Sequence, residues 1–426
     1  MFKFVHASDL HLGAAFEGIQ SVLPQAAEAL RRATYEALDR IVQLAVSERA
    51  SLVLLAGDLC NRADGSLKAE LTLRRAAQQL HEAGIPVMAV YGNHDYLAPE
   101  RPDLDWPASA HVFPAEPTTL RSVTASDGST IYVYGRSYGR PDEQSNLASS
   151  YPTPPTDGFA VALLHAACGA VTGHERYAPC TLEDLRARGY DYWALGHVHS
   201  HGVLSRQAPA VVYPGCPQGL NPNETGPRGC CLVTVSDDGK PSVEFRDTDS
   251  VRWFIEEADI SDMQREQDLL DALAGRLKGL ASQLSAHQKG LVRFRLVGRG
   301  PLHRRCCDPQ FAEHLKDDLN EQTSQLPVPV WTESVQSHTR PEVDLQQRRE
   351  AQDFLGDFLR TADEAARDRH KLEELWDGIR QGIASGHAKL LRDMGIDPAA
   401  VPIEKLKQWL EEAAILGADH LLETER

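Results

Sequence analysis

Short apolar runs alternate with longer amphipathic stretches over the first 100 residues of the chain. Apolar residues dominate 2–7, 51–56 and 87–91, and each run has the length of a buried strand. Between these runs, 24–49 and 66–83 place apolar residues three or four positions apart, which is the spacing of a helix with one buried face. This strand–helix–strand–helix–strand order predicts a parallel sheet with right-handed crossover connections.

The region up to residue 248 carries further predicted elements of the same kinds. They are strands at 131–135, 159–164 and 190–195, a helix at 182–188, and a hairpin formed by 230–235 and 242–245. Strands and helices that alternate in this way predict an α/β fold.

Metal-competent side chains follow five of the apolar runs at the point where each run ends. They are Asp9 with His11, Asp58, Asn93, His165, and His197 with His199. Parallel strands end at one edge of a sheet, where open α/β folds bind their ligands, so we expect these seven side chains to converge. Taken singly, Asp58 could be a turn residue and His165 a hydrogen-bonded core histidine. Five repetitions of one pattern favour a binding site instead.

Carboxylate, imidazole and amide ligands without cysteine favour Mn²⁺, Fe²⁺ or Zn²⁺ over Ca²⁺ or Cu⁺. Seven ligands exceed what one such ion takes, so we expect two divalent ions that share a bridging carboxylate, with Mn²⁺ as the first choice. Two ions about 3.5–4 Å apart form the arrangement that splits phosphate esters. The residues alone therefore predict a two-metal phosphoesterase site.

Composition narrows the class of protein. The chain has 426 residues, of which 42% are hydrophobic and 25% charged, and this is typical of a globular protein of two or three domains. A formal net charge of −17 argues against nonspecific coating of nucleic acid, but it allows an enzyme that contacts DNA over a small patch.

Several signals bear on location. No run approaches the roughly 18 apolar residues of a membrane span, and the N-terminal residues become polar too soon for a signal peptide. The eight cysteines show neither zinc-site nor disulfide-framework spacing. We therefore expect a cytoplasmic protein with reduced thiols and no membrane partner.

The order of these motifs resembles the calcineurin-like metallophosphoesterases. Asp-x-His, Gly-Asp, Gly-Asn-His-Asp, a strand-end histidine and Gly-His-x-His follow one another as they do in that family. The segments 8–13, 55–59 and 213–219 resemble the SbcD-type DNA repair exonucleases more closely, and within those the YhaO branch. The resemblance is strong over 1–235. It implies a metallophosphoesterase sandwich in which helices flank mostly parallel sheets.

The resemblance also implies a role for each residue of the site. One metal ion would be held by Asp9, His11, Asp58 and His199, and the second by Asp58, Asn93, His165 and His197. A hydroxide between the ions would attack phosphorus. His94 would stabilise or protonate the leaving oxygen, and Asp95 would orient His94.

The chain departs from its relatives directly after Gly57-Asp58-Leu59. Cys60 and Asn61 stand where Phe and then Asp or His are usual. We expect Cys60 to be a small buried substitute for the aromatic ring. Asn61 has no useful pKa, so proton transfer from that position is not expected.

The character of the sequence changes near Thr248, which predicts three domains. They are 1–248, 249–340 and a helical C-terminal segment at 341–426. The resemblance implies that 1–248 is a nuclease domain and that 249–340 is a small α/β capping domain that helps to grip DNA. Between Lys289 and Arg305 the capping domain holds six Lys or Arg and no Asp or Glu.

Three arginines are candidate DNA contacts. Arg293 and Arg295 lie on the polar face of the alternating strand 291–297. Arg228 lies in the turn-rich loop 221–229, which follows the Pro-Gly motif at Pro214 and Gly215. A strand face that is merely solvated is the alternative interpretation of the basic stretch.

The C-terminal helices, which carry Trp376 and Trp409, have more apolar surface than they could bury alone. A segment of this kind binds the coiled coil of an SMC-like ATPase in SbcD relatives, so the resemblance implies a YhaN-like or SbcC-type partner. Packing against the chain's own cap is the alternative. A homodimer is compatible with the family.

The sequence thus predicts a DNA repair exonuclease that hydrolyses phosphodiester bonds with two metal ions and works with an SMC-like ATPase. Two other functions stay open. One is a phosphatase or phosphodiesterase of small substrates on the same fold, and the other is a non-catalytic, metal-bound scaffold subunit.

Overall fold

The computed structural model describes residues 1–16, 24–61, 67–97, 105–169, 176–342, 345–382, 397 and 400–424. The chain forms two compact units. The first comprises Met1–Glu256, Leu273–Phe294 and Lys316–Val335, and the second comprises Glu257–Ala272, Arg295–Leu315 and Gln336–Arg426.

The first unit contains a six-stranded sheet with strand order β12-β11-β1-β2-β3-β4. Its strands are β1 (Phe2–Ala7), β2 (Val53–Ala56), β3 (Val87–Val90), β4 (Ala110–Val112), β11 (Gly229–Val235) and β12 (Pro241–Asp247). The pairs among β1, β2, β3 and β4 are parallel, whereas β11 pairs antiparallel with both β1 and β12. The three parallel strands β1 to β3 are the first three apolar runs of the sequence.

A second six-stranded sheet has the order β5-β6-β7-β8-β10-β9. Its strands are β5 (Thr119–Thr124), β6 (Thr130–Arg136), β7 (Phe159–His165), β8 (Tyr192–Gly196), β9 (Gly202–Ser205) and β10 (Ala210–Tyr213). The central strands β6, β7, β8 and β10 pair in parallel, and the two edge strands are antiparallel. The short elements η2 (Leu147–Ser150) and α3 (Leu182–Arg186) lie in the connections.

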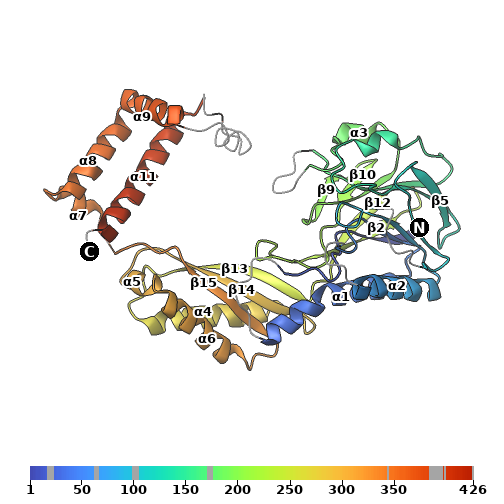
Figure 1. Ribbon diagram of the computed structural model, residues 1–426, viewed down its shortest axis with the longest axis horizontal. Coiled ribbons are helices and arrows are strands. Elements are labelled where there is room, and N and C mark those ends of the chain that lie inside the picture. Colours follow the sequence, from blue (N-terminus) through green and yellow to red (C-terminus); the bar gives the residue numbers. More distant parts are fainter. Residues whose placement is uncertain are drawn as a thin grey trace. The chain divides into compact units, whose positions relative to one another are not determined.

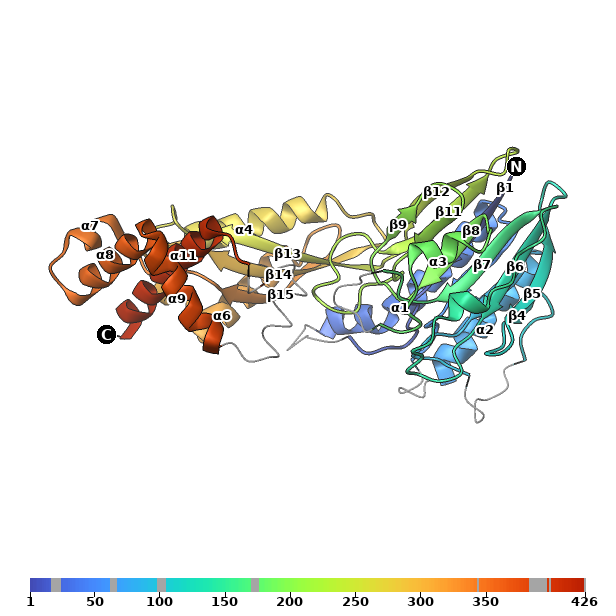
Figure 2. The same cartoon turned by 90° about the horizontal axis from the view of Figure 1, so that it is seen from above.

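The two sheets pack face to face and bury an apolar layer between them (Figure 2). Phe4 and Leu54 of the first sheet meet Val161 and Tyr192 of the second in this layer, and all four are fully buried. On the other face of the first sheet, α1 (Pro24–Ser47) and α2 (Leu67–Glu82) cover a second apolar cluster (Figure 1). Strands buried on both faces must be apolar throughout, which explains their continuous apolar runs.

A third sheet has the order β13-β14-β15. It consists of β13 (Val251–Asp259), β14 (Lys289–Val297) and β15 (Val330–Ser337), with helices α4 (Glu266–Ala281), α5 (His303–Cys306) and α6 (Pro309–Thr323) between the strands. Each strand contributes residues to both compact units. In the first unit, Trp253 and Leu291 of this sheet pack against Leu30 and Ala33 of α1.

The C-terminal part of the second unit is helical where the structure describes it. It contains α7 (Leu345–Glu350), α8 (Phe354–Arg367), α9 (Arg369–Gly382) and α11 (Ile403–Thr424). Leu355 and Leu359 of α8 pack against Ala418 of α11. Asp419 of α11 pairs with Arg299 and Arg340, so part of this segment contacts the residues of the predicted cap.

The predicted fold class is confirmed: mostly parallel sheets form a sandwich with flanking helices, and a small α/β region and a helical C-terminal segment follow. The sandwich contains two sheets, whereas the pattern of apolar runs alone predicted that all five strand ends lie at the edge of one parallel sheet. The three predicted domain ranges stay a prediction. Parts of the predicted helices, at 66, 343–344 and 383–394, lie outside the described residues. Within the described residues, no helix has the length and apolar character needed to cross a membrane.

Candidate metal centre

The five strand ends that the sequence singled out meet at one place, although they come from two sheets. Asp9 and His11 follow β1, Asp58 follows β2, and Asn93 follows β3 in the first sheet. The second sheet supplies His165 as the last residue of β7, and its β8 leads directly into His197 and His199. The contacts described below show that these side chains converge.

The backbone at this place adopts conformations that most residues avoid. Asp9, His11, Asp58 and His197 all have positive φ angles, of 52°, 42°, 52° and 104°. Such angles cost about 1–3 kcal/mol each in non-glycine residues and gather at functional sites. Asp9 and His11 therefore do not lie on an extended strand. A left-handed turn brings them together instead.

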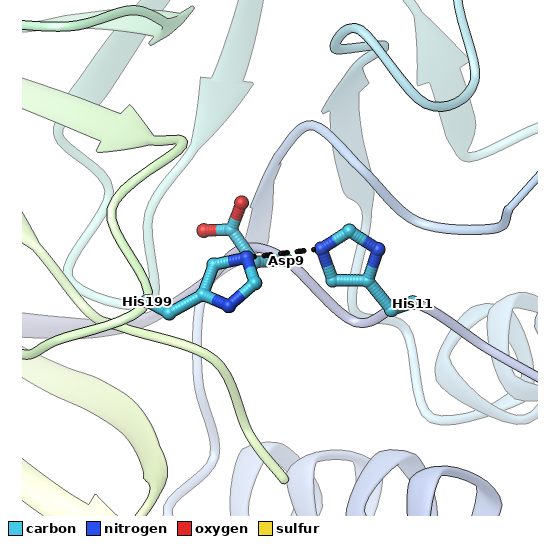
Figure 3. Close-up of side chains that lie close together, drawn as sticks. All are labelled: Asp9, His11 and His199. Carbon is cyan, nitrogen blue, oxygen red and sulfur yellow. Dashed lines mark hydrogen bonds between the residues drawn. The ribbon is translucent and has the colours of Figure 1, made fainter. Parts of the chain in front are cut away.

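Figure 3 shows the first group of side chains, Asp9, His11 and His199. The two imidazoles face each other, and their Nε2 atoms are 3.1 Å apart. Ligand atoms of all three residues lie within 4.8 Å of one another. The Asp9 carboxylate also accepts a hydrogen bond from the backbone N–H of His197, which ties the ends of β1 and β8 together.

The second group centres on Asp58, which is 2% exposed. Its Oδ2 lies 3.3 Å from Nε2 of His165, and that nitrogen is also 3.1 Å from Oδ1 of Asn93. His11 Nε2 is 4.0 Å from the same Asp58 oxygen, so Asp58 connects the two groups. The ring of His197 stands beside that of His165, with 5.2 Å between their centroids. This connecting position is the one that a bridging carboxylate requires.

Three of the imidazoles are held in the orientation that a metal ligand needs. Nδ1 of His11 is 2.7 Å from Oδ1 of Asn61, Nδ1 of His199 is 2.6 Å from Oε1 of Glu224, and Nδ1 of His165 is 2.9 Å from the carbonyl oxygen of Ala56. Because these oxygens accept the Nδ1 proton, Nε2 keeps its lone pair and faces the centre. Buried carboxylates beside converging Nε2 atoms fit two divalent cations.

The charges around Asp58 and His165 also favour a bound cation. Burial raises the pKa of Asp58, but the charges of His165, His11 and His94 outweigh burial and place that pKa below its usual value. Burial likewise opposes the charged form of His165, but Asp58 raises the pKa of this imidazole to about 9. The buried carboxylate of Asp58 therefore favours a positive charge beside it. A divalent cation would supply that positive charge instead.

His94 and Asp95 complete the turn after β3. His94 is exposed, its ring centroid lies 4.9 Å from that of His11, and its backbone N–H donates to Oδ1 of Asp58 over 2.9 Å. Asp95 is buried and accepts hydrogen bonds from the backbone N–H groups of Gly92 and Leu59, both over 2.7 Å. Asp95 thus fixes the turn that presents His94. Its predicted contact with the His94 imidazole stays a prediction.

The three candidate DNA contacts have different surroundings. Arg228 donates to the carbonyl oxygens of His199, Glu224 and Thr225. Arg293 forms a two-bond ion pair with the buried carboxylate of Glu333. Arg295 is half-buried, and its Nε has no hydrogen-bond partner in the described part of the chain. Phosphate contacts by Arg228 or Arg293 would compete with these internal bonds.

Two residues of the centre were not predicted. Asn61 was set aside as a weak proton donor, yet its amide oxygen orients His11. Glu224 lies 25 residues after its partner His199, in a loop without regular structure. The signal that could have found Glu224 is an acidic residue in the turn-rich loop after the Pro-Gly motif. Cys60 is buried, in agreement with its predicted packing role.

Gly92 gives a test of how tightly the centre is packed. A Cβ atom at this position would lie 2.4 Å from Oδ1 of Asp58 and 2.8 Å from the His165 ring. We expect Gly92→Ala to displace both side chains and weaken Mn²⁺ binding by about tenfold or more. Calorimetric titration of metal-free protein measures this loss. Gly275→Ala on helix α4 is the control, because a Cβ atom there would meet open space. Wild-type affinity for Mn²⁺ in Gly92→Ala would contradict the packing described here.

Comparisons with known proteins agree with this geometry. Residues 2–201 match the model of the calcineurin-like phosphoesterases, and residues 253–340 match that of the middle domain of metallophosphoesterase YhaO. An uncharacterized metallophosphoesterase of Bacillus subtilis (strain 168), YhaO, is 31% identical over 417 residues, which cover 97% of this chain and 96% of the relative.

Other matches cover only part of the chain. The DNA double-strand break repair protein Mre11 of Sulfurisphaera tokodaii is 24% identical over 212 residues, covering 49% of this chain and 52% of its own. A solved dimetal phosphatase from Danio rerio is 14% identical with a TM-score of 0.33, over 55% of this chain and 93% of its own. The near full-length match to YhaO decides the family: this chain belongs to the calcineurin-like metallophosphoesterases and, within them, to the YhaO family.

Proposed function

We propose that this protein is a two-metal phosphodiesterase that hydrolyses DNA as an exonuclease. The observation that carries the proposal is the convergence of Asp9, His11, Asp58, His165 and His199 beside the exposed imidazole of His94. A buried ligand set next to an exposed acid–base group is what hydrolysis of an external phosphodiester requires. Similarity to proteins described as DNA double-strand break repair protein Mre11 supports DNA as the substrate.

The residues divide the work between holding cations and moving protons. Asp9, His11, Asp58 and His199 would hold one ion, and Asp58, Asn93, His165 and His197 the other. When bound, the ions lower the pKa of water and neutralise charge on the phosphate. A ring nitrogen of His94 donates a hydrogen bond or a proton to the leaving oxygen. Asp95 keeps the turn of His94 in place through Gly92 and Leu59.

The direct test compares substrates. Purified protein with Mn²⁺ is incubated with end-labelled duplex DNA, end-labelled single-stranded DNA and bis-p-nitrophenyl phosphate. The proposal predicts metal-dependent loss of label from DNA that proceeds from an end. Brisk hydrolysis of the small diester without any DNA cleavage would contradict the DNA substrate. Inactivity on all three with both ions bound would favour a scaffold role.

A phosphodiesterase of small substrates is the second candidate. The observation that favours it is that two of the three predicted DNA contacts, Arg228 and Arg293, are engaged in internal bonds. The concentration of six basic residues between Lys289 and Arg305 speaks for DNA instead.

We further propose that the C-terminal helices bind an SMC-like ATPase of the YhaN or SbcC type. Several apolar side chains of these helices are exposed although their neighbours form a core. They are Phe354 at 67%, Ile379 at 57%, Leu416 at 55% and Leu375 at 46%. An exposed apolar face of this kind is typical of a partner-binding helix. Cytoplasmic location and a homodimer stay predictions from the sequence.

The partner proposal predicts the effect of charge on α9. Leu375 and Ile379 lie one helical turn apart, so Leu375→Lys with Ile379→Lys places two charges on the exposed face. We expect the double variant to lose binding to the coiled-coil base of such an ATPase, measured by light scattering of the mixed proteins. Leu67→Lys, at another exposed apolar position, should keep it. Unchanged binding by the double variant would contradict the proposal.

A further inference from the structure

Glu224 contacts His199 on the side away from the metal centre. Its Oε1 is 2.6 Å from Nδ1 of His199, while Nε2 of the same ring faces His11 across 3.1 Å. The Glu224 side chain is 12% exposed and that of His199 is 21% exposed, so water weakens this contact little. Glu224 lies outside the set of side chains that end the strands.

The carboxylate is itself held firmly. The second oxygen of the carboxylate accepts a hydrogen bond from the backbone N–H of Leu220. The backbone N–H of Glu224 donates to the carbonyl oxygen of Asn221 over 3.0 Å. Arg228 spans the same loop: its guanidinium donates to the carbonyl of Glu224 over 3.2 Å and to that of His199 over 2.6 Å. The loop therefore connects the carboxylate and the imidazole through both backbone and side chain.

We propose that Glu224 is the positioning residue for His199 and that its negative charge strengthens this imidazole as a metal ligand. Of the three imidazoles whose Nδ1 contacts are described above, His199 has a carboxylate partner, whereas His11 and His165 have neutral oxygens. A carboxylate on the outer nitrogen fixes the tautomer and makes Nε2 a stronger donor. This inference rests on the proposed metal-dependent function and deepens it.

A purely structural role for Glu224 makes a different prediction. If the carboxylate only anchored the loop through Leu220, its loss would lower stability and leave the affinity for cations unchanged. A positioning role acts on the ligand, so affinity falls even where the fold is intact. The Gln variant separates the two roles, because an amide oxygen can still accept a hydrogen bond but carries no charge.

The experiment measures Mn²⁺ binding to full-length, metal-free protein by calorimetric titration, with thermal unfolding recorded alongside. We expect Glu224→Ala to weaken the binding of one of the two ions by about 10–100-fold, which is the usual effect of losing a residue that orients a metal ligand. The affinity of Glu224→Gln should lie between those of Glu224→Ala and wild type. Glu48→Gln is the matched control, since Glu48 is a half-buried carboxylate that pairs with Lys3 away from the centre. Its affinity should equal that of wild type.

Wild-type affinity in either Glu224 variant would overturn the proposal. An equal loss in Glu48→Gln would also overturn it, because a general loosening of the fold would then explain every variant. A different result would contradict the proposed function. If the wild-type chain binds two Mn²⁺ ions but cleaves no phosphodiester, the function is wrong, whereas the role of Glu224 in metal binding is unaffected.

Discussion

Replacing Asp58 with Asn is expected to abolish metal-dependent hydrolysis and to lower the number of bound Mn²⁺ ions below two. Asp58 approaches His165 within 3.3 Å and His11 within 4.0 Å, so its carboxylate is shared by both groups of ligands. The amide keeps the shape but loses the charge and one acceptor oxygen. Loss of a residue that only orients a ligand lowers metal affinity by about 10–100-fold. Loss of a ligand that both ions share should lower it further.

Elemental analysis of the dialysed variant and its hydrolysis rate measure the two effects of Asp58→Asn. Asp191→Asn is the control. Asp191 is a half-buried carboxylate before β8 that accepts a hydrogen bond from the backbone of Ala160, so its loss removes a similar group outside the centre. Two ions and wild-type activity in Asp58→Asn would show that this carboxylate is not the bridge.

Replacing His94 with Ala is expected to lower the rate of phosphodiester cleavage by about 10²–10⁴-fold while both ions stay bound. The bond from this residue to Asp58 uses its backbone N–H, which the Ala variant keeps. The imidazole is exposed next to His11, where a substrate can reach it. Single-turnover cleavage under saturating substrate, together with metal content, separates the chemical step from metal binding.

His81→Ala is a suitable control for His94→Ala, because His81 is an exposed histidine on helix α2 that contacts Ser109 away from the centre. Full activity of the His94 variant would remove the proposed acid and favour a scaffold role. Loss of an ion from that variant would instead make His94 a ligand, since one of its ring nitrogens lies within 4.8 Å of possible ligand atoms of Asp58 and His11.

The sequence predicted the convergence of the ligands because the same event recurs at five strand ends. The strand ends could be located from continuous apolar runs such as Val87–Val90, which are buried on both faces. The sequence did not reveal that β7 and β8 belong to a second sheet. Apolar runs look alike in any buried strand, whichever sheet it joins.

What the sequence missed depends on contacts between distant loops. The partners of His11 and His199 lie 50 and 25 residues away, and neither follows a periodic pattern. Arg293 belongs to the basic stretch, but its partner Glu333 comes from β15, 40 residues later. The local run of basic residues therefore predicted that Arg293 is available to DNA, whereas in the fold it forms an internal ion pair.

The most direct test of the central claim is a titration of metal-free protein with Mn²⁺ in which bound metal and cleavage of end-labelled duplex DNA are followed together. Our account predicts no cleavage without metal and a rate that rises to its maximum as the second ion binds to each chain. DNA cleavage by the metal-free protein, or binding of two ions without cleavage of DNA at any Mn²⁺ concentration, would contradict it.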